Sequence, residues 1–187
     1  LPSCNSEATV SVTMVEPPVA DAGADKYVCY GSTVQIGGST GSEEGVEYEW
    51  THPEDLENET QNSPTPMLKP VTKDQMYKLT ATSTIVDNCK SQDSVWVYKV
   101  AKPKKFEVTG TGSYCEGTGS TGMVVKLSGS EPDVEYQLLK DGNVLSLPWK
   151  RGGSGELSWA GDITSGFDIT AGVYTVIARK VNHTGCE

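Results

Sequence analysis

The stretch that decides the fold is Asp74–Val100, DQMYKLTATSTIVDNCKSQDSVWVYKV. Apolar side chains alternate with polar ones over its first part, at Tyr77, Leu79 and Ala81. This period of two is typical of a half-buried β-strand. A turn-forming Asp-Asn pair and Cys89 follow, and Ser94–Val100 is a second segment rich in Val, Trp and Tyr. The stretch therefore predicts two β-strands joined by a hairpin that carries a cysteine.

Parts of the same unit recur at both ends of the chain. Residues 3–12, SCNSEATVSV, align with residues 88–97, and residues 172–186 repeat the first half of the unit with its cysteine in register. A fixed internal repeat is the sequence signature of a modular array. We therefore expect a tail strand and linker of a preceding module at 1–16, a complete module at 17–100, and a module lacking its final strand at 101–187.

The rest of the chain predicts an all-β fold of two tandem β-sandwiches, because short alternating segments are separated by frequent turn residues and no helical pattern occurs. Residues 5–15 alternate and predict an extra N-terminal strand. Residues 46–50 predict a core strand, and residues 134–138 predict its counterpart in the second module. The Asp-Gly pair within residues 140–143 predicts a tight hairpin, since these residues accept positive φ angles.

The five cysteines follow the repeat. Each module has one early cysteine and one at its late hairpin, so the register predicts the disulfides Cys29–Cys89 and Cys115–Cys186. Cys4 belongs to the preceding module and is expected to be unpaired. Disulfides at these positions imply an oxidising compartment: extracellular, periplasmic or at the cell surface. The alternative, five free buried cysteines in a cytosolic protein, does not explain why the cysteines fall in register.

Charge excludes two classes of partner. The 187 residues carry 25 acidic and 15 basic side chains, for a net charge of −10, and the basic residues form no stripe. Binding to phosphate backbones needs clustered Lys and Arg, so nucleic acid is not an expected partner. The same argument applies to anionic membranes, and no apolar run reaches membrane-spanning length.

The residues that could do chemistry are few. The chain has two histidines, and His52 lies in a polar loop where a surface position is expected. A zinc site would need clustered His and Cys, and a nucleophile would need a neighbouring His, so the sequence predicts no catalytic set and no cofactor. Asp21 and Asp25 are weak calcium candidates, since hard carboxylate oxygens suit Ca²⁺. The acidic run within residues 43–59 is better explained as a solvated face.

Three tryptophans are candidate ligand-facing aromatics: Trp96, Trp149 and Trp159. Exposed rings can stack on sugars, and the alternation places Trp96 on the outer face of its strand. The alternative is that these rings pack in a core or between modules.

Two segments resemble known modules. Residues 17–100, with PPVADAGADKYVCYGSTVQIGG, YEW and YKLTATSTIVDNC, resemble the PKD-like and Ig-like repeats of large Bacteroidetes cell-surface proteins. Residues 106–187, with YCEG, LSGSEPDVEYQLLKDG and AGVYTVIARKVNHTGC, resemble a companion Ig-like repeat of the same proteins. The resemblance implies a non-catalytic stalk, spacer or adhesive segment of a secreted adhesin or gliding-associated protein. Its partners would be other repeats of the same chain, surface glycans or surface proteins.

Two other classes of function stay open: a carbohydrate-binding module, and an accessory segment of a secreted enzyme. A further expectation concerns association. Unpaired sheet edges recruit strands. We expect residues 5–15 of one molecule to complete the second module of another, an association that depends on where the chain is cut.

Overall fold

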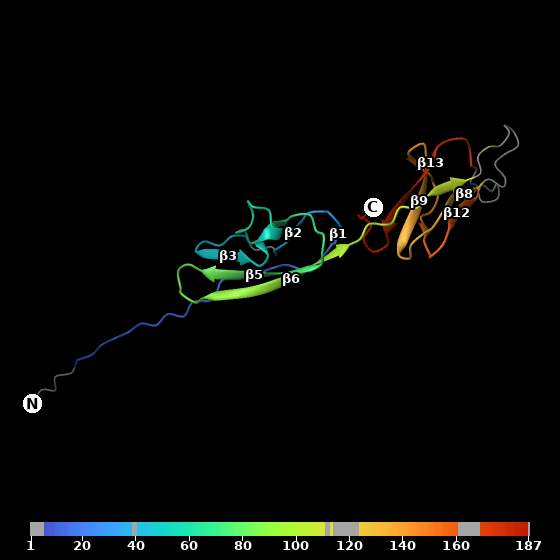
Figure 1. The fold of residues 1–187 in the computed structure, drawn as a ribbon. Helices are drawn as coiled ribbons and strands as arrows, with labels where there is room; N and C mark the ends of the chain where they lie inside the picture. The colour runs from blue at the N-terminus through green and yellow to red at the C-terminus, as the bar shows by residue number, and fades with distance from the viewer. Residues whose placement is uncertain (1–5, 39–40, 111–112, 114–123, 161–168, 187) are drawn as a thin grey trace, which may run out of the picture. The chain divides into compact units, whose positions relative to one another are not determined.

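The computed structural model describes residues 6–38, 41–110, 113, 124–160 and 169–186. Within these ranges the secondary structure consists of β-strands and one short 3-10 helix, η1 (Pro53–Asp55). The chain divides into two compact units (Figure 1). The first unit comprises Leu1–Lys26, Thr33–Pro70 and Asp74–Tyr98, and the second comprises Tyr27–Ser32, Val71–Lys73 and Lys99–Glu187.

The main sheet, most of which belongs to the first unit, has the strand order β1-β6-β5-β3, and the second unit takes in the end of β1 from Tyr27 and the end of β6 from Lys99. Its strands are β1 (Lys26–Cys29), β6 (Lys90–Val100), β5 (Gln75–Ser83) and β3 (Val46–Trp50). A second, two-stranded sheet is formed by β2 (Val34–Gln35) and β4 (Met67–Leu68).

The hairpin predicted from residues 74–100 is confirmed as β5 paired antiparallel with β6. Its inward side chains are almost completely buried, at exposed fractions between 0% and 4%, namely Tyr77, Leu79, Ala81, Val95 and Val97. The core strand predicted at 46–50 is also confirmed as β3, where Tyr48 and Trp50 are buried. Period-two alternation identified these strands because each has one face on the core.

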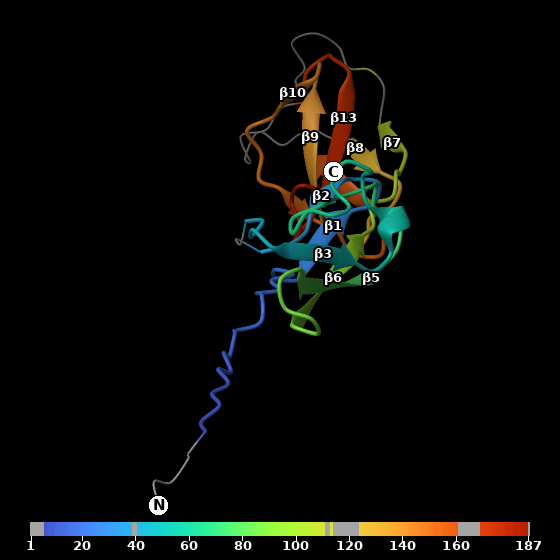
Figure 2. The same cartoon turned by 90° about the vertical axis from the view of Figure 1, so that its left-hand side faces the viewer.

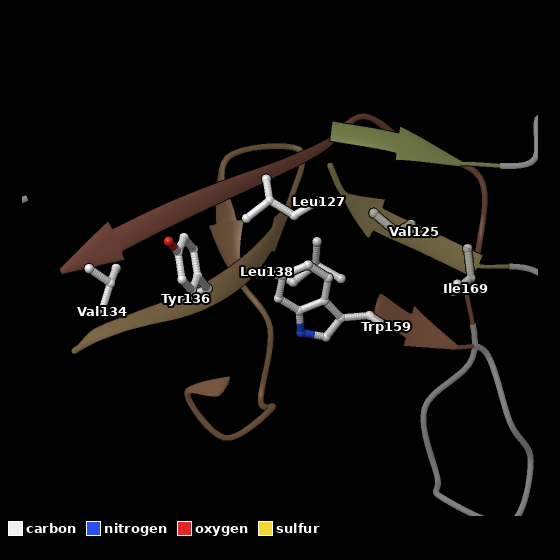
Figure 3. Close-up of a cluster of buried hydrophobic side chains, with 7 residues drawn as sticks. All are labelled: Val125, Leu127, Val134, Tyr136, Leu138, Trp159 and Ile169. Atoms are coloured by element: carbon white, nitrogen blue, oxygen red, sulfur yellow. The ribbon is translucent and has the colours of Figure 1, made fainter. Parts of the chain in front are cut away.

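The second unit contains two further sheets. One pairs β9 (Val134–Lys140) with β10 (Asn143–Val144), β11 (Lys150–Arg151) and β13 (Tyr174–Lys180). The other has the order β12-β8-β7, from β12 (Leu157–Ala160), β8 (Val124–Leu127) and β7 (Val108–Gly110). Between them lies an apolar core (Figure 3) of Val125, Leu127, Val134, Tyr136, Leu138, Trp159 and Ile169.

The chain enters β3 of the first unit and β9 of the second in the same way. A residue with positive φ precedes β3 and β9: Gly45 at 76° and Asp133 at 60°. In the first unit the backbone N–H of Glu43 donates to the Tyr48 hydroxyl at 3.2 Å. In the second, the N–H of Glu131 donates to the hydroxyl of Tyr136, the counterpart of Tyr48, at 2.9 Å. The repeat in the sequence is therefore a repeat in local structure.

The late hairpins also correspond. In the first unit the N–H of Ser83 donates to the carbonyl of Cys89 at 2.9 Å, after β5. In the second unit the N–H of Lys180 donates to the carbonyl of Cys186 at 3.4 Å, after β13. Since β13 continues the alignment of β5, the two strands occupy equivalent positions in the two units.

The tight turn predicted between residues 140 and 143 is confirmed. Asp141 and Gly142 have φ angles of 50° and 78°, and Asn143 pairs with Lys140 across the two-residue loop. Two positive φ angles in sequence are what a type I′ hairpin requires.

The extra N-terminal strand predicted at residues 5–15 is wrong for the residues that the structure describes there. Residues 6–15 form no strand, and in both views (Figures 1 and 2) this segment lies away from the sheets. Its apolar residues are almost fully exposed, with Val10 at 88%, Val12 at 90% and Met14 at 95%. Alternating side chains give a segment one apolar face that could pack in a sheet. A strand also needs a neighbouring strand for its backbone hydrogen bonds, and alternation does not supply one.

The strand content and the packed sheets make this an all-β protein of Ig-like sandwich architecture. The module boundaries at residues 17 and 101 stay a prediction. Among the described residues, no helix has the length and apolar character needed to cross a membrane.

Candidate functional site

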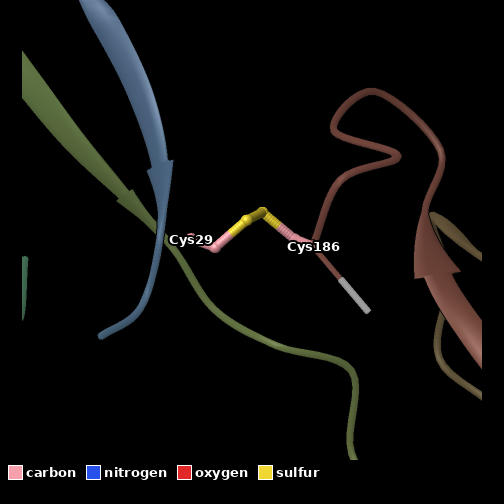
Figure 4. The surroundings of a disulfide bond; sticks show 2 residues. All are labelled: Cys29 and Cys186. Atoms are coloured by element: carbon pink, nitrogen blue, oxygen red, sulfur yellow. A yellow bond between two sulfur atoms is a disulfide. The ribbon is translucent and has the colours of Figure 1, made fainter. Parts of the chain in front are cut away.

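The structure pairs Cys29 with Cys186 (Figure 4), with their Cα atoms 5.3 Å apart. Both residues lie in the second unit. Close to the bond, the ring of Tyr27 stacks on that of His183 at a centroid separation of 5.0 Å. The predicted Cys29–Cys89 and Cys115–Cys186 disulfides are therefore wrong.

The reason lies in the direction of β1. The N–H of Ala22 donates to the Asp93 carboxylate, and the N–H of Tyr30 donates to the carbonyl of Val100, so the segment leading through β1 runs alongside β6 in the same direction. Cys29 therefore lies beside the C-terminal end of β6, while Cys89 precedes its N-terminal end. Eleven residues of strand span roughly 35 Å. A disulfide needs Cα atoms about 4.4–6.8 Å apart.

The remaining cysteines are only partly placed. Cys89 is the free cysteine among the described residues, and its thiol lies 3.9 Å from the carbonyl oxygen of Glu16. Cys4 and Cys115 lie outside the described residues.

Trp96, which is exposed, forms an aromatic pair with the half-buried Tyr98 on β6. Its exposed fraction is 41%, and its ring stacks on Tyr98 at 5.7 Å with an interplanar angle of 10°. The neighbours Val95 and Val97 point inward at 0% and 1%, so the alternation places Trp96 outward as the sequence predicts. The exposed Trp96 ring and the half-buried Tyr98 ring lie nearly parallel and form a flat apolar surface suited to stacking, and ligand binding there stays a prediction.

The other two tryptophans are engaged within the second unit. Trp159 is 5% exposed and pairs in register with Val125, so its prediction as a ligand-facing ring is wrong. For Trp159 the alternative interpretation of the sequence, packing in a core, is the one that the structure bears out. Trp149 is half-buried, and the Arg179 guanidinium lies 3.8 Å from its ring centroid. Arg179 is in turn held by two hydrogen bonds to the Glu135 carboxylate.

The two calcium candidates accept backbone hydrogen bonds. Asp21 accepts from the N–H of Gly23 at 3.0 Å, and Asp25 accepts from the N–H of Trp96 at 2.8 Å. Asp25 thus ties the entry of the first unit to β6. These bonds account for both carboxylates without an ion, and calcium binding stays a prediction.

The sequence analysis missed one cluster, His52, Glu54 and Asp55 at η1. One ligand atom from each lies within 4.8 Å of the others. Gln75 Nε2 donates to the Met76 carbonyl and lies 2.9 Å from His52 Nε2, so that ring nitrogen acts as the acceptor. The Nδ1–H then donates to the Glu54 carboxylate at 3.3 Å, a tautomer inferred from the hydrogen bonds.

The Tyr77 hydroxyl completes the cluster by donating to Asp55 at 3.2 Å. Burial raises the pKa of Tyr77 well above its usual value, and the neighbouring Asp55 carboxylate raises this pKa further. The cluster offers a donor set that Zn²⁺ accepts. However, His52 and Asp55 already make hydrogen bonds that account for their positions. The short His-Pro-Glu-Asp run was the one sequence signal for it.

Comparison with known proteins adds little. No protein-family model matches the chain, and no curated protein matches it. Among solved structures, a Sidekick-1 structure of immunoglobulin domains 1–4 is similar, with 14% identity and a TM-score of 0.37 over 88% of this chain and 43% of that one. Titin domains Z1Z2, solved in complex with telethonin, match with 14% identity and a TM-score of 0.36 over 88% of this chain and 89% of that one. This chain spans less than half of the Sidekick-1 structure. At these TM-scores the matches do not extend the description of the fold beyond what the sheets show.

Proposed function

We propose that this chain is a non-catalytic structural and adhesive repeat segment, a stalk or spacer, of a large extracellular surface protein of the Bacteroidetes type. The observation that carries the proposal is the structural repeat. In both units a backbone N–H ahead of the strand donates to a tyrosine hydroxyl within it, in β3 and in β9. The same hairpin hydrogen bond follows β5 and β13. Repetition of a small module is how a chain gains length, and this use needs no active site.

The Cys29–Cys186 disulfide supports the extracellular part of the proposal. Disulfides persist in oxidising compartments and are rare in the cytosol. The net charge of −10 is compatible with a surface that repels anionic membranes and nucleic acid.

Antibodies raised against the chain test this function. They are expected to label intact source cells without permeabilisation, and to detect a band far above the 20.0 kDa of this chain on reducing gels. Labelling that requires permeabilisation, or a band at the chain's own mass, contradicts the proposal.

A carbohydrate-binding module is the second candidate, favoured by the stacked pair of Trp96 and Tyr98. A glycan microarray with the wild-type chain and Trp96→Ala separates the two functions. Binding that is lost in Trp96→Ala supports the carbohydrate-binding function. No glycan binding leaves the stalk or spacer as the better account.

A further inference from the structure

Three side chains that can bind a metal ion meet at one turn of the first unit. His52 lies directly before η1, and Glu54 and Asp55 lie within it. One ligand atom from each lies within 4.8 Å of the others. An imidazole nitrogen with two carboxylates is a ligand set that Zn²⁺ uses in proteins, whereas the hard cation Ca²⁺ takes oxygen ligands. The histidine therefore favours zinc over calcium at this turn.

The spacing of the ligand atoms fits a zinc ion. Zinc–nitrogen and zinc–oxygen bonds are roughly 2.0–2.2 Å long, so a tetrahedral ion holds neighbouring ligand atoms roughly 3.3–3.6 Å apart. The Nδ1 atom of His52 lies 3.3 Å from the Oε1 atom of Glu54. This separation is longer than the range of about 2.7–3.2 Å that is usual for an N–H···O hydrogen bond, and it equals the tetrahedral spacing. Rotation of the Asp55 side chain brings the third ligand atom, now within 4.8 Å, to the same spacing.

Two side chains of β5 orient the histidine and the aspartate. Gln75 Nε2 lies 2.9 Å from Nε2 of His52, the ring nitrogen that is not directed at Glu54. The Tyr77 hydroxyl donates to Oδ2 of Asp55 at 3.2 Å, and the Tyr77 ring meets the His52 ring edge to face at 6.0 Å. Metal ligands in proteins are oriented by outer contacts of this kind. Two of the three ligands are therefore in position before an ion binds.

The local charge attracts a cation. The pKa of the Tyr77 phenol is raised by burial and, in addition, by the negative charges of Asp55 and Glu54. Lys69 is a neighbouring cation, and its ammonium donates to the backbone carbonyl of Glu54 at 2.8 Å and not to the Glu54 carboxylate. Two carboxylates thus place negative charge at the turn, where a divalent cation would offset it.

We propose that His52, Glu54 and Asp55 bind Zn²⁺ through Nδ1 of the imidazole and one oxygen of each carboxylate, with water as the fourth ligand. Coordination at Nδ1 requires the ring proton to move from Nδ1 to Nε2, so the imidazole stays neutral. The Gln75 amide then turns and accepts this proton's hydrogen bond with its oxygen. The inference goes beyond the proposed function, because neither a stalk nor a carbohydrate-binding module requires a metal ion.

Competition with a chromophoric zinc chelator tests the proposal on the untagged full chain. Thiols that are not in the disulfide are alkylated first, because thiolates bind zinc themselves. The wild type is expected to take up one zinc ion per chain, and added Ca²⁺ is expected not to displace it.

His52→Asn removes the nitrogen ligand and keeps the backbone. Asparagine accepts the positive φ of 57° at this position, so the variant is expected to fold. Loss of an outer contact alone weakens metal affinity about 10–100-fold, so loss of this ligand is expected to weaken zinc binding by at least about 100-fold. Glu54→Gln is a second variant at a side chain that is 65% exposed, and it is also expected to lose affinity.

His183→Asn is the matched control. His183 is the other histidine of the chain and lies in the second unit, so this variant is expected to bind zinc like the wild type. Nitrogen-15 spectra of the imidazole rings add a readout of geometry. Zinc is expected to shift the Nδ1 resonance of His52 and to leave the proton on Nε2.

Three results overturn the proposal. The first is that the alkylated wild type takes up no zinc. The second is equal zinc binding by the wild type, His52→Asn and Glu54→Gln, which would place the ion elsewhere on the chain. The third is ligation through Nε2 of His52, which would turn the ring away from Glu54.

Discussion

At the scale of single residues, burial separates two of the tryptophans that were candidate ligand-facing rings. Trp159 lies in the core of the second unit at 5% exposure, while Trp96 lies on an outer face at 41%. We expect Trp159→Ala to lower the free energy of unfolding by about 3–5 kcal/mol, the usual cost of removing a buried aromatic side chain. Trp96→Ala is the matched control and is expected to cost under about 1 kcal/mol. Urea denaturation followed by circular dichroism measures both, and equal losses contradict the assignment of Trp159 to the core.

Because of Tyr77, the free energy of unfolding is expected to vary with pH in the alkaline range. Its pKa is raised in the folded state by burial and by Asp55, so the folded chain keeps the phenol proton after the unfolded chain loses it near pH ~10. The free energy of unfolding therefore has its full value below this pH and falls as the pH rises above it. Tyr77→Phe is expected to weaken this fall in denaturation curves taken between neutral and alkaline pH. Tyr30, which is half-exposed, is the control position. An equally weakened fall of the unfolding free energy in Tyr30→Phe would contradict the role of Tyr77.

At the scale of elements, the β9–β10 hairpin depends on backbone conformation. Gly142 has a φ of 78°, and a Cβ added there meets no atom within 4 Å, so any cost of Gly142→Ala comes from the backbone alone. We expect a loss of about 1 kcal/mol in unfolding free energy, the lower end of the penalty for a left-handed non-glycine residue. Gly153→Ala is the control, since the space around it is also open and its φ is not in the left-handed region. A loss at Gly153 equal to that at Gly142 would contradict the turn assignment.

Alternation predicted the elements that have one buried face and paired neighbours, such as β3, β5 and β6. It failed for residues 6–15, because a pattern of side chains does not supply a partner for the backbone. The disulfide could not be predicted for a related reason. A repeat shows that Cys89 and Cys186 are equivalent, but equivalence between modules says nothing about which sulfur atoms are close. The His52 cluster was missed because Gln75 and Tyr77, which complete it, are distant in the sequence.

At the scale of the whole molecule, the Cys29–Cys186 bond joins residues 157 positions apart. Closing so long a loop restricts the unfolded chain, and the chain-entropy model gives a stabilisation on the order of 5 kcal/mol. We expect Cys186→Ser, or reduction of the wild type, to lower the unfolding free energy of the second unit by this order. Cys89→Ser serves as the control because Cys89 makes no disulfide among the described residues. Equal effects of the two variants in denaturant titrations would contradict the observed pairing.

The same bond also decides how the chain carries tension. A pull applied at its two ends reaches Cys29, crosses the sulfur atoms and leaves at Cys186, so the peptide between these residues lies outside the load path. An oxidised chain can then lengthen only through the residues outside the loop, at about 3.3–3.6 Å each, even if its sandwiches lose their structure. When the disulfide is reduced, the residues between the two cysteines can also be extended. For a molecule stretched by flow, the maximum length of the chain would depend on whether the Cys29–Cys186 bond is oxidised or reduced, and not on how well its core packs.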